Sequence, residues 1–302
     1  MNSEKANVKR VLITGATSGI GFSATIQLCE LGHTVVFTAR NEEKGEKTLK
    51  AVKSLLPCAN VSYCVLDLDS FESVEQATVE LVKLHEFSPF DVMILNAAVM
   101  LPPESQTIYG LDSTFQVNFL THYFLALKLV KAKPEGHHLH IVCLSSVLLK
   151  LFDGFPWRIP KNEMKFERLF SPKEKSGWKS YALSKFALAA FSETLNLEEN
   201  VSAVAVNPGN SMTSVSRHMS LKRKRLFKIF KSSLIPVEDA ARNVIRAALQ
   251  TIPSGHYLDK EKIVALPRPV TDHQSQKHLI NMSEKILDRI ISSRISEKSA
   301  TL

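Results

Sequence analysis

Five short apolar runs, each followed by a segment of helical length, constrain the fold of this chain more than any other feature. The runs read KRVLIT, HTVVFTA, VSYCVLDL, FDVMILNA and HLHIVCLSS. They are rich in β-branched residues and apolar almost throughout, which indicates strands whose two faces are both covered by helices. The alternation of strand and helix therefore predicts an α/β fold with a doubly wound parallel sheet.

The length and composition of the chain favour a single domain. With 302 residues, of which 44% are hydrophobic, the chain can bury a full core. The alternation stops after Ser146 and resumes with the run VSAVAVNPG. We therefore expect a domain over residues 1–260 that carries an insertion at 147–177 and a basic segment at 210–235. Residues 261–302 are expected to form a helical extension.

The charge balance and the cysteines narrow the choice of partners. A formal net charge of +8 favours anionic partners such as phosphates, nucleic acid or an acidic membrane surface. The four cysteines show neither CxxC nor Cys/His ligand spacing, which argues against a metal site and a disulfide framework. No run has the length of an apolar membrane span. We expect a cytoplasmic protein, and a peripheral position on an intracellular membrane stays open.

The segment TGATSGIG, residues 14–21, lies between the first apolar run and a helical segment. Gly15 permits a sharp turn, Gly19 lets backbone N–H groups approach a pyrophosphate, and Gly21 allows close packing of helix on strand. This context predicts the dinucleotide site of a Rossmann fold, although such glycines also serve a tight turn alone. The residues assigned to the cofactor in this segment are Gly15, Thr17, Ser18, Gly19, Ile20 and Gly21.

The end of the second run distinguishes between the two nicotinamide dinucleotides. An acidic residue usually binds the ribose hydroxyls of NAD there, but this chain has Arg40, followed by Lys44 one helical turn later. A guanidinium group matches a 2′-phosphate, so NADP(H) is the expected cofactor. The alternative is that both residues are solvated surface charges. Asp67, after the third run, is placed either to accept from the adenine amino group or to cap the next helix.

Tyr181 and Lys185 lie four residues apart on a predicted helix and therefore on one face of it. A cation beside a phenol lowers the pKa of the phenol, which suits Tyr181 for proton transfer. Ser146 follows the fifth run, where its hydroxyl can bond a substrate oxygen, and Ser145 is its rival for this role. Asn118 is either a structural residue or part of a proton relay through water. These residues form the expected catalytic set.

Six landmarks follow one another along the chain, and together they resemble one family. They are TGATSGIG, Asn96-Ala97-Ala98, Asn118, Ser146, the Tyr181/Lys185 pair, and Pro208-Gly209 followed by Thr213. In this order they resemble the short-chain dehydrogenases/reductases over roughly residues 8–260. The terminal segment resembles the retinol dehydrogenase-like branch.

The resemblance implies a role for each matching residue. Tyr181 is implied to be the general acid and base, and Lys185 to lower its pKa and bind the nicotinamide ribose. Ser146 would orient the carbonyl group, and Asn118 would hold a relay water. Support of the nicotinamide side of the site is implied for Asn96 and Thr213.

The expected activity is NADP(H)-dependent hydride transfer to or from an alcohol or carbonyl group of an apolar small molecule. A retinoid, a steroid, a fatty aldehyde and a xenobiotic ketone all fit this description. The alternative is a sensor or interaction protein that binds the dinucleotide but turns over little, since the presence of these residues does not establish their geometry. The family also implies a homodimer formed through the helices beside Tyr181.

Two departures from the family pattern affect the expected site. Val99 stands where a glycine is usual, which removes backbone freedom at that position. The gap between Ser146 and Tyr181 is longer than in compact members, so the additional residues are expected to cover the substrate.

A basic run, LKRKRLFKIFK at residues 221–231, contains six cations and no acids, with apolar residues grouped near one helical face. It lies where the family has its substrate-binding flap. The run fits either a helix that contacts a membrane surface or one that packs by its apolar side and keeps a solvated basic face. No nucleic-acid partner is expected, because no base-reading module surrounds it.

Overall fold

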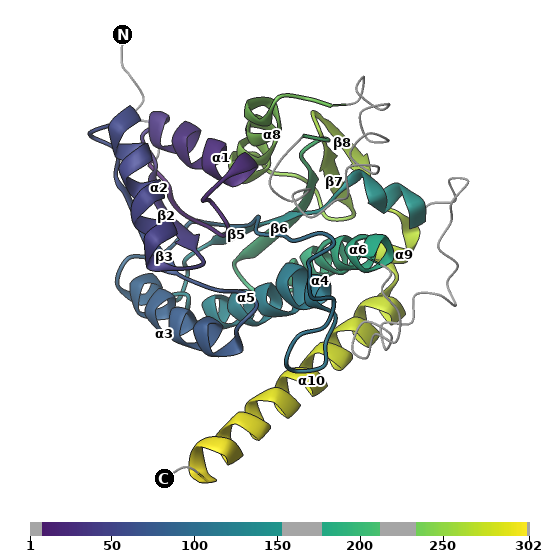
Figure 1. The fold of residues 1–302 in the computed structure, drawn as a ribbon. Helices are drawn as coiled ribbons and strands as arrows, with labels where there is room; N and C mark the ends of the chain where they lie inside the picture. Colours follow the sequence, from purple (N-terminus) through teal and green to yellow (C-terminus); the bar gives the residue numbers. More distant parts are fainter. Residues whose placement is uncertain (1–7, 153–176, 212–233, 301–302) are drawn as a thin grey trace.

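A single β-sheet runs through the molecule. The computed structural model describes residues 8–152, 177–211 and 234–300, and in these ranges the sheet has eight strands in the order β3-β2-β1-β4-β5-β6-β7-β8 (Figure 1). Strands β1 to β7 are parallel, and β8 pairs antiparallel to β7. The strands are β1 (Arg10–Ile13), β2 (Thr34–Ala39), β3 (Val61–Val65), β4 (Val92–Leu95), β5 (Leu139–Leu144), β6 (Val201–Asn207), β7 (His256–Asp259) and β8 (Lys262–Ala265).

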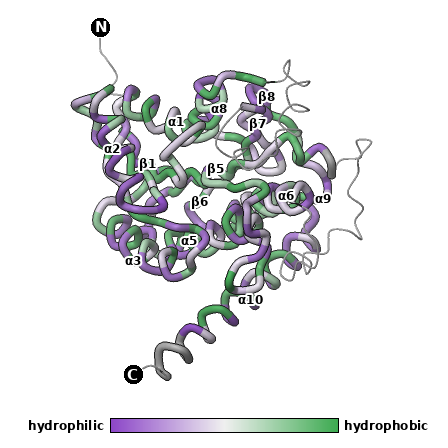
Figure 2. The backbone as a smooth tube through the Cα atoms, viewed as in Figure 1, coloured by the Kyte–Doolittle hydropathy of each residue, from purple (hydrophilic) through white to green (hydrophobic). Residues whose placement is uncertain are grey.

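Helices cover both faces of the sheet, which confirms the predicted doubly wound α/β fold (Figure 1). One face carries α1 (Gly19–Glu30), α2 (Glu42–Leu55) and α8 (Val237–Leu249). The other face carries α3 (Phe71–Phe87), α5 (Thr121–Ala132) and α6 (Gly177–Leu195). Each layer encloses its own buried apolar cluster, and in Figure 2 the central strand β5 is mainly hydrophobic. The shorter helical elements are α4 (Ser113–Phe115), η1 (Gln116–Leu120), η2 (Val147–Phe152) and α9 (Arg268–Thr271).

The strand order creates a crevice at the carboxyl edge of the sheet. Strand β1 lies between β2 and β4, so the connections that leave β1 and β4 run to opposite faces. Ligands of open α/β sheets bind where the strand order reverses in this way. The glycine-rich turn at 14–21 follows β1, and Ser146 follows β5. The topology therefore brings the two predicted parts of the site to the same edge.

The helices that follow β2 and β3 begin at side chains that accept a backbone N–H. Asn41 caps α2 by accepting from the N–H of Lys44, and Ser70 caps α3 by accepting from the N–H of Ser73. Asp67 accepts instead from the N–H of Asp69 at 3.1 Å. The alternative that Asp67 caps the helix after the third strand is therefore wrong, because Ser70 is the capping residue.

The sheet extends beyond residue 260, the predicted end of the Rossmann-type domain, so the expected helical extension at 261–302 begins with a strand. Strand β8 forms a hairpin with β7, and the turn between them places Lys260 at φ 57°. A lysine in this left-handed conformation gives no hairpin signal in the sequence, because such turns favour Gly, Asn or Asp. Of the predicted insertion, 153–176 lies outside the described residues. The same is true of Thr213 and of the basic run at 221–231.

The end of the chain forms α10 (His273–Ala300), a long helix that packs against α6 and α9 and extends past the body of the molecule (Figure 1). Arg294 of α10 forms an ion pair of 3.2 Å with Glu75 of α3. The expected homodimer through the helices beside Tyr181 stays a prediction, and α10 packs on one of those helices. The buried apolar residues of α10 are Leu279, Ile286, Leu287 and Ile290.

The described residues contain no metal-binding group of three His, Cys, Asp or Glu side chains. The cysteines are free thiols. Among the helices of the described ranges, none is both long enough and apolar enough to cross a membrane.

The packing of α10 yields a stability prediction. Leu279 is fully buried, so Leu279→Ala should lower the free energy of unfolding by about 2 to 5 kcal/mol through lost burial and a residual cavity. Asn281→Ala, on the exposed side of the same helix, is the matched control. Urea denaturation measures both variants. An equal, small effect of the two substitutions would show that α10 is not docked on the body.

Candidate active site

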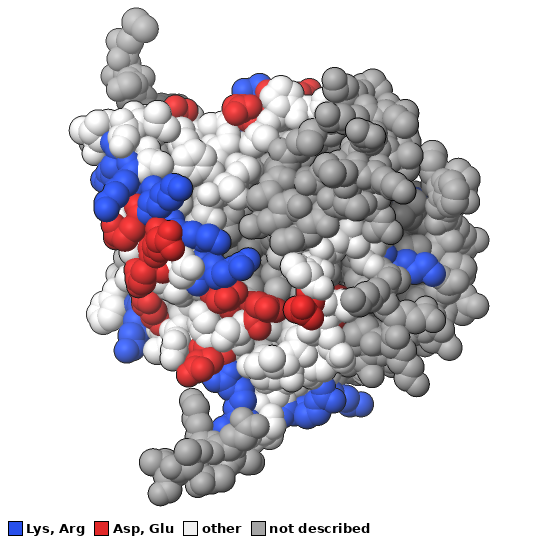
Figure 3. Space-filling view, viewed as in Figure 1, with Lys and Arg blue, Asp and Glu red and all other residues white. Residues whose placement is uncertain are grey.

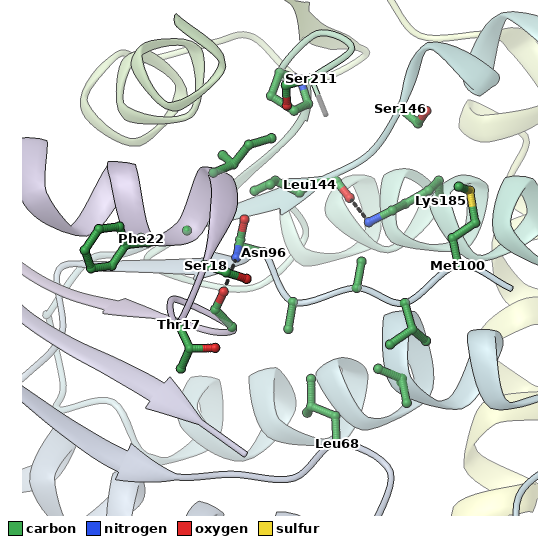
Figure 4. Close-up of a pocket in the computed structure, with 18 of the residues that line it drawn as sticks. Thr17, Ser18, Phe22, Leu68, Asn96, Met100, Leu144, Ser146, Lys185 and Ser211 are labelled. Carbon is green, nitrogen blue, oxygen red and sulfur yellow. Dashed lines mark hydrogen bonds between the residues drawn. The ribbon is translucent and has the colours of Figure 1, made fainter. Parts of the chain in front are cut away.

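A cavity of about 680 Å³ opens at the carboxyl edge of the sheet. Figure 4 shows Thr17 and Ser18 on one side of it and Ser146 and Lys185 on the other. Its volume lies within the usual range for small-molecule sites. Gly19 and Asn118 do not line it, and Thr213 lies outside the described residues. The predicted site residues that do line it are Gly15, Thr17, Ser18, Ile20, Gly21, Arg40, Lys44, Asp67, Asn96, Ser146, Tyr181 and Lys185.

The glycine-rich turn needs glycine for conformation and for close approach. Gly15 and Gly19 have φ values of 67° and 59°, in the left-handed region that favours glycine. A Cβ atom at Gly21 would lie 2.6 Å from the carbonyl oxygen of Gly15, which is closer than real contacts allow. Because these positions fix the backbone at the start of α1, the N-terminus of that helix faces the cavity, where it suits a pyrophosphate.

Asn96 and Thr14 hold the turn in place. The amide of Asn96 donates to the carbonyl oxygens of Thr14 at 2.7 Å and Gly15 at 3.1 Å. The hydroxyl oxygen of Thr14 in turn accepts the N–H groups of Asn96 and Ala97, both at 3.0 Å. Asn96 therefore joins the end of β4 to the turn after β1. Its implied support of the nicotinamide stays a prediction, beside this structural role.

Cations gather at the end of the cavity formed by β2 and α2. Arg40 and Lys44 line it there, and the Nε of Arg40 lies 3.9 Å from a carboxylate oxygen of Asp67. Lys47 lines the same wall and was missed by the sequence analysis. The signal was its spacing of three residues from Lys44, which puts both on one helical face. Figure 3 shows acidic side chains beside the basic ones on the side of the molecule where α2 and α3 lie.

Helix α6 carries Tyr181 and Lys185 to the opposite end of the cavity. Lys185 is almost fully buried, and its Nζ donates to the carbonyl oxygen of Leu144 at 2.7 Å. The same Nζ lies 5.6 Å from the centre of the Tyr181 ring. The two predicted residues are therefore neighbours, with the ammonium over the ring face.

Burial controls the proton affinity of both groups. It raises the pKa of Tyr181 to about 12 and lowers the pKa of Lys185 to about 7, against an opposing effect of Cys143 on the lysine. The expected lowering of the pKa of the phenol is therefore wrong for this arrangement, because the ammonium is bound to Leu144 and desolvation dominates. The phenol of Tyr181 consequently carries its proton at neutral pH.

The two adjacent serines differ in what their hydroxyl groups do. Ser145 is buried, and its hydroxyl donates to the carbonyl oxygen of Lys185 at 2.9 Å. Both serines line the cavity, and the Oγ of Ser146 accepts the N–H of Leu148 at 3.3 Å. An accepted bond uses a lone pair and not the hydroxyl proton. Ser146 is thus the serine whose proton suits a substrate oxygen.

Asn118 is fully buried behind the cavity wall. Its Oδ1 accepts the N–H of Val99 at 2.8 Å, and its Nδ2 donates to the Val99 carbonyl and to the Ser184 hydroxyl, both at 3.0 Å. The side chain therefore ties the segment after β4 to α6. The implied relay water stays a prediction. Val99 fits without glycine's freedom, and the left-handed residue of this loop is Leu101 at φ 54°.

The rest of the cavity wall combines one unpaired polar group with several apolar side chains. Ser211 also lies on this wall, and its buried hydroxyl has no hydrogen-bond partner within the described ranges. A polar ligand group in the cavity would satisfy it, so the residues present fit a dinucleotide together with a mainly apolar substrate. Larger apolar side chains on the cavity wall include Val99, Met100, Val117, Leu148, Trp178 and Leu234.

Comparisons with known proteins agree with this geometry. The family model described as short chain dehydrogenase matches residues 9–153. Polyprenol dehydrogenase of Homo sapiens is 29% identical over 269 residues, covering 83% of this chain and 76% of that protein. Retinol dehydrogenase 13 of Mus musculus is 25% identical, covering 92% and 84%. A crystal structure of a protein from Mycobacterium Paratuberculosis has a TM-score of 0.68 at 25% identity, with 92% of each chain covered.

The contrast between the two serines gives a kinetic prediction. Ser146→Ala should lower kcat for carbonyl reduction by about 100-fold or more, the usual effect of removing one donor to a reacting oxygen. Ser145→Ala is the control, since its hydroxyl bonds the backbone of α6. It should lower stability by about 1 kcal/mol and change kcat little. The reverse pattern would make Ser145 the catalytic serine.

Proposed function

Because the chain belongs to the short-chain dehydrogenase family, we propose that it is an NADP(H)-dependent oxidoreductase that acts on an alcohol or carbonyl group of an apolar substrate. The observation that carries the proposal is the single cavity shared by the glycine-rich turn and by Ser146, Tyr181 and Lys185. A dinucleotide bound along the turn extends from the cations at α2 toward these three residues.

The nicotinamide supplies or accepts the hydride when it is bound. The chain supplies the proton and the orientation. Tyr181 holds a proton on its phenol oxygen and donates it to the substrate oxygen, which carries developing negative charge during reduction. Ser146 donates a second hydrogen bond to the same oxygen and orients it. Lys185 donates to the carbonyl oxygen of Leu144 and lines the cavity, and its remaining N–H groups would bind the ribose.

The preference for NADP(H) rests on charge. The cavity end at β2 and α2 has three cationic side chains, Arg40, Lys44 and Lys47, which together favour a 2′-phosphate. The first of them occupies the position where a carboxylate usually binds the ribose of NAD. Asp67 is the acidic neighbour of Arg40 and limits its freedom, which helps to hold the guanidinium at the cavity wall.

The preference for an apolar substrate rests on the apolar side chains of the cavity wall. Met100, Leu148, Trp178 and Leu234 line the same cavity as Tyr181. The names of two similar proteins, polyprenol dehydrogenase and retinol dehydrogenase 13, refer to isoprenoid alcohols. A long or cyclic isoprenoid alcohol, or the corresponding aldehyde, is the substrate class that we propose.

Tyr181→Phe tests the proposed reaction. The substitution removes the proton donor and leaves the ring, so turnover of NADPH with a carbonyl substrate should fall by about 100-fold or more. The affinity for NADPH should stay within a factor of about two, since the lost hydroxyl does not hold the dinucleotide. Tyr123→Phe is the control, because Tyr123 is buried and does not line the cavity. Absorbance at the nicotinamide band follows turnover with retinal, steroid ketones and aliphatic aldehydes. Tight binding of NADPH without oxidation by any carbonyl would favour the sensor alternative.

Arg40→Ala tests the choice of dinucleotide. Loss of a charge-assisted bond to the 2′-phosphate should raise the Kd for NADPH by about 10- to 100-fold and leave that for NADH nearly unchanged. Lys50→Ala is the control, because Lys50 is a cation on the adjacent helix α2 that is exposed and does not line the cavity. Fluorescence titration measures both affinities. An equal loss for the two dinucleotides would exclude recognition of the phosphate by Arg40.

A further inference from the structure

A fully buried histidine lies between the two halves of the site. His122, in the first turn of α5, has no exposed surface, and both of its ring nitrogens have partners. Its Nε2 lies 2.9 Å from the Oγ1 of Thr14, at the glycine-rich turn. Its Nδ1 lies 3.0 Å from the carbonyl oxygen of Asn118. The ring thus connects the dinucleotide turn to the residue behind the catalytic helix.

The partners determine where the proton of the ring lies. A carbonyl oxygen can only accept, so Nδ1 carries the hydrogen and donates it to Asn118. Nε2 then accepts from the hydroxyl of Thr14, whose oxygen already accepts the N–H groups of Asn96 and Ala97. Burial lowers the pKa of His122 to about 4, which agrees with a neutral ring.

The hydrogen bonds continue from Asn118 into helix α6. The Nδ2 of Asn118 donates to the hydroxyl oxygen of Ser184, and this hydroxyl donates to the backbone carbonyl of Tyr181 at 2.8 Å. Thr14, His122, Asn118 and Ser184 are all fully buried. One buried chain of hydrogen bonds therefore joins the glycine-rich turn to the helix that bears Tyr181.

The backbone beside His122 has an unusual conformation. Between α4 and α5 the chain forms one π-helical turn, η1, which contains Asn118. Such turns are rare and occur frequently at functional sites. Apolar residues fill most of this layer, and an apolar side chain in place of His122 would leave the carbonyl of Asn118 and the hydroxyl of Thr14 without these partners. The histidine satisfies both groups at once.

We propose that His122 is a positioning residue that sets the distance between the bound nicotinamide and the Tyr181/Lys185 pair. The inference rests on the proposed oxidoreductase function. Hydride transfer and proton donation must reach the same carbonyl group together, and misplacement by about 1 Å costs about 100-fold in rate. His122 touches neither the cavity nor the reacting atoms, so it acts through the turn and through Asn118. A fully satisfied buried network is rigid enough to transmit this constraint.

Two substitutions separate the two hydrogen bonds. In His122→Asn the amide N–H takes the place of Nδ1–H and keeps the bond to Asn118, whereas in His122→Gln the amide reaches the place of Nε2 and keeps the bond to Thr14. Each variant breaks the chain at a different bond. We expect each to lower kcat by about 10- to 100-fold, while KM and the Kd for NADPH stay within a factor of about two.

A control variant separates a loss of stability from a loss of catalytic rate. His85 is also fully buried, and its Nδ1 accepts the N–H of Phe90 beside the amino end of β4, at the edge opposite the cavity. His85→Asn should lower the thermal midpoint to a similar extent and leave kcat unchanged. A kcat loss in His85→Asn that matches the loss in the His122 variants would reduce the role of His122 to general stability and overturn the proposal.

A double-mutant cycle tests the chain itself. Ser184→Ala interrupts the same chain near Tyr181, so His122→Asn combined with Ser184→Ala should lower kcat little more than the stronger single variant does. Multiplication of the two losses would show independent effects and overturn the inference. Unchanged kcat in correctly folded His122 variants would overturn it as well.

A measurement that needs no turnover distinguishes failure of the positioning role from failure of the proposed oxidoreductase function. Nitrogen NMR of the ¹⁵N-histidine-labelled protein, with the signals of His122 identified by their loss in His122→Asn, should show the neutral Nδ1–H tautomer. An Nε2–H tautomer would overturn the hydrogen-bond chain whatever the activity. If the wild-type protein oxidises NADPH with none of the carbonyl compounds, the proposed function is overturned and the positioning role with it. If the wild-type protein turns over and the His122 variants turn over equally well, only the positioning role is overturned.

Discussion

The hydrogen bonds between the end of β1 and the end of β4 are the interaction on which the site depends. The two strands are neighbours, but their connections leave toward opposite faces and open a crevice between them. Hydrogen bonds join the two connections at this point. Thr14 accepts two backbone N–H groups after β4, and Asn96 donates to two carbonyl groups after β1. The conformation of the glycine-rich turn, and hence the direction of α1, follows from these hydrogen bonds.

The charged side chains at the two ends of the cavity differ in their exposure to water. At α2 the cations stay partly exposed, where they lose little hydration and create a positive potential. At α6 the ammonium of Lys185 is shielded from water, and this desolvation lowers its pKa. Desolvation raises the pKa of the Tyr181 phenol. The cavity therefore has cations at one end and the titratable pair Tyr181 and Lys185 at the other.

The fold and most of the candidate site could be predicted from local patterns. TGATSGIG between a strand and a helix, and Tyr181 four residues before Lys185 on one helix, are short-range arrangements that the backbone geometry of a strand, turn or helix already implies. Three features could not be predicted in this way. The turn of β7 and β8 uses Lys260 in an unusual conformation, Lys47 joins the cavity only because α2 packs at its edge, and His122 resembles an ordinary polar residue in an apolar helix.

The amino-acid sequence by itself determined the alternation of strands and helices as far as β7, the dinucleotide turn, the absence of a carboxylate after β2, and the residues able to perform proton chemistry. Periodicity and local backbone preference carry that information, so neighbours along the chain suffice to read it. Tertiary structure alone decided which serine hydroxyl is bound to the backbone of α6, that Ser70 and not Asp67 caps α3, and that Asn118 and His122 link the turn to α6. Those outcomes depend on hydrogen bonds and burial between residues far apart in sequence, and such contacts exist only once the layers have packed.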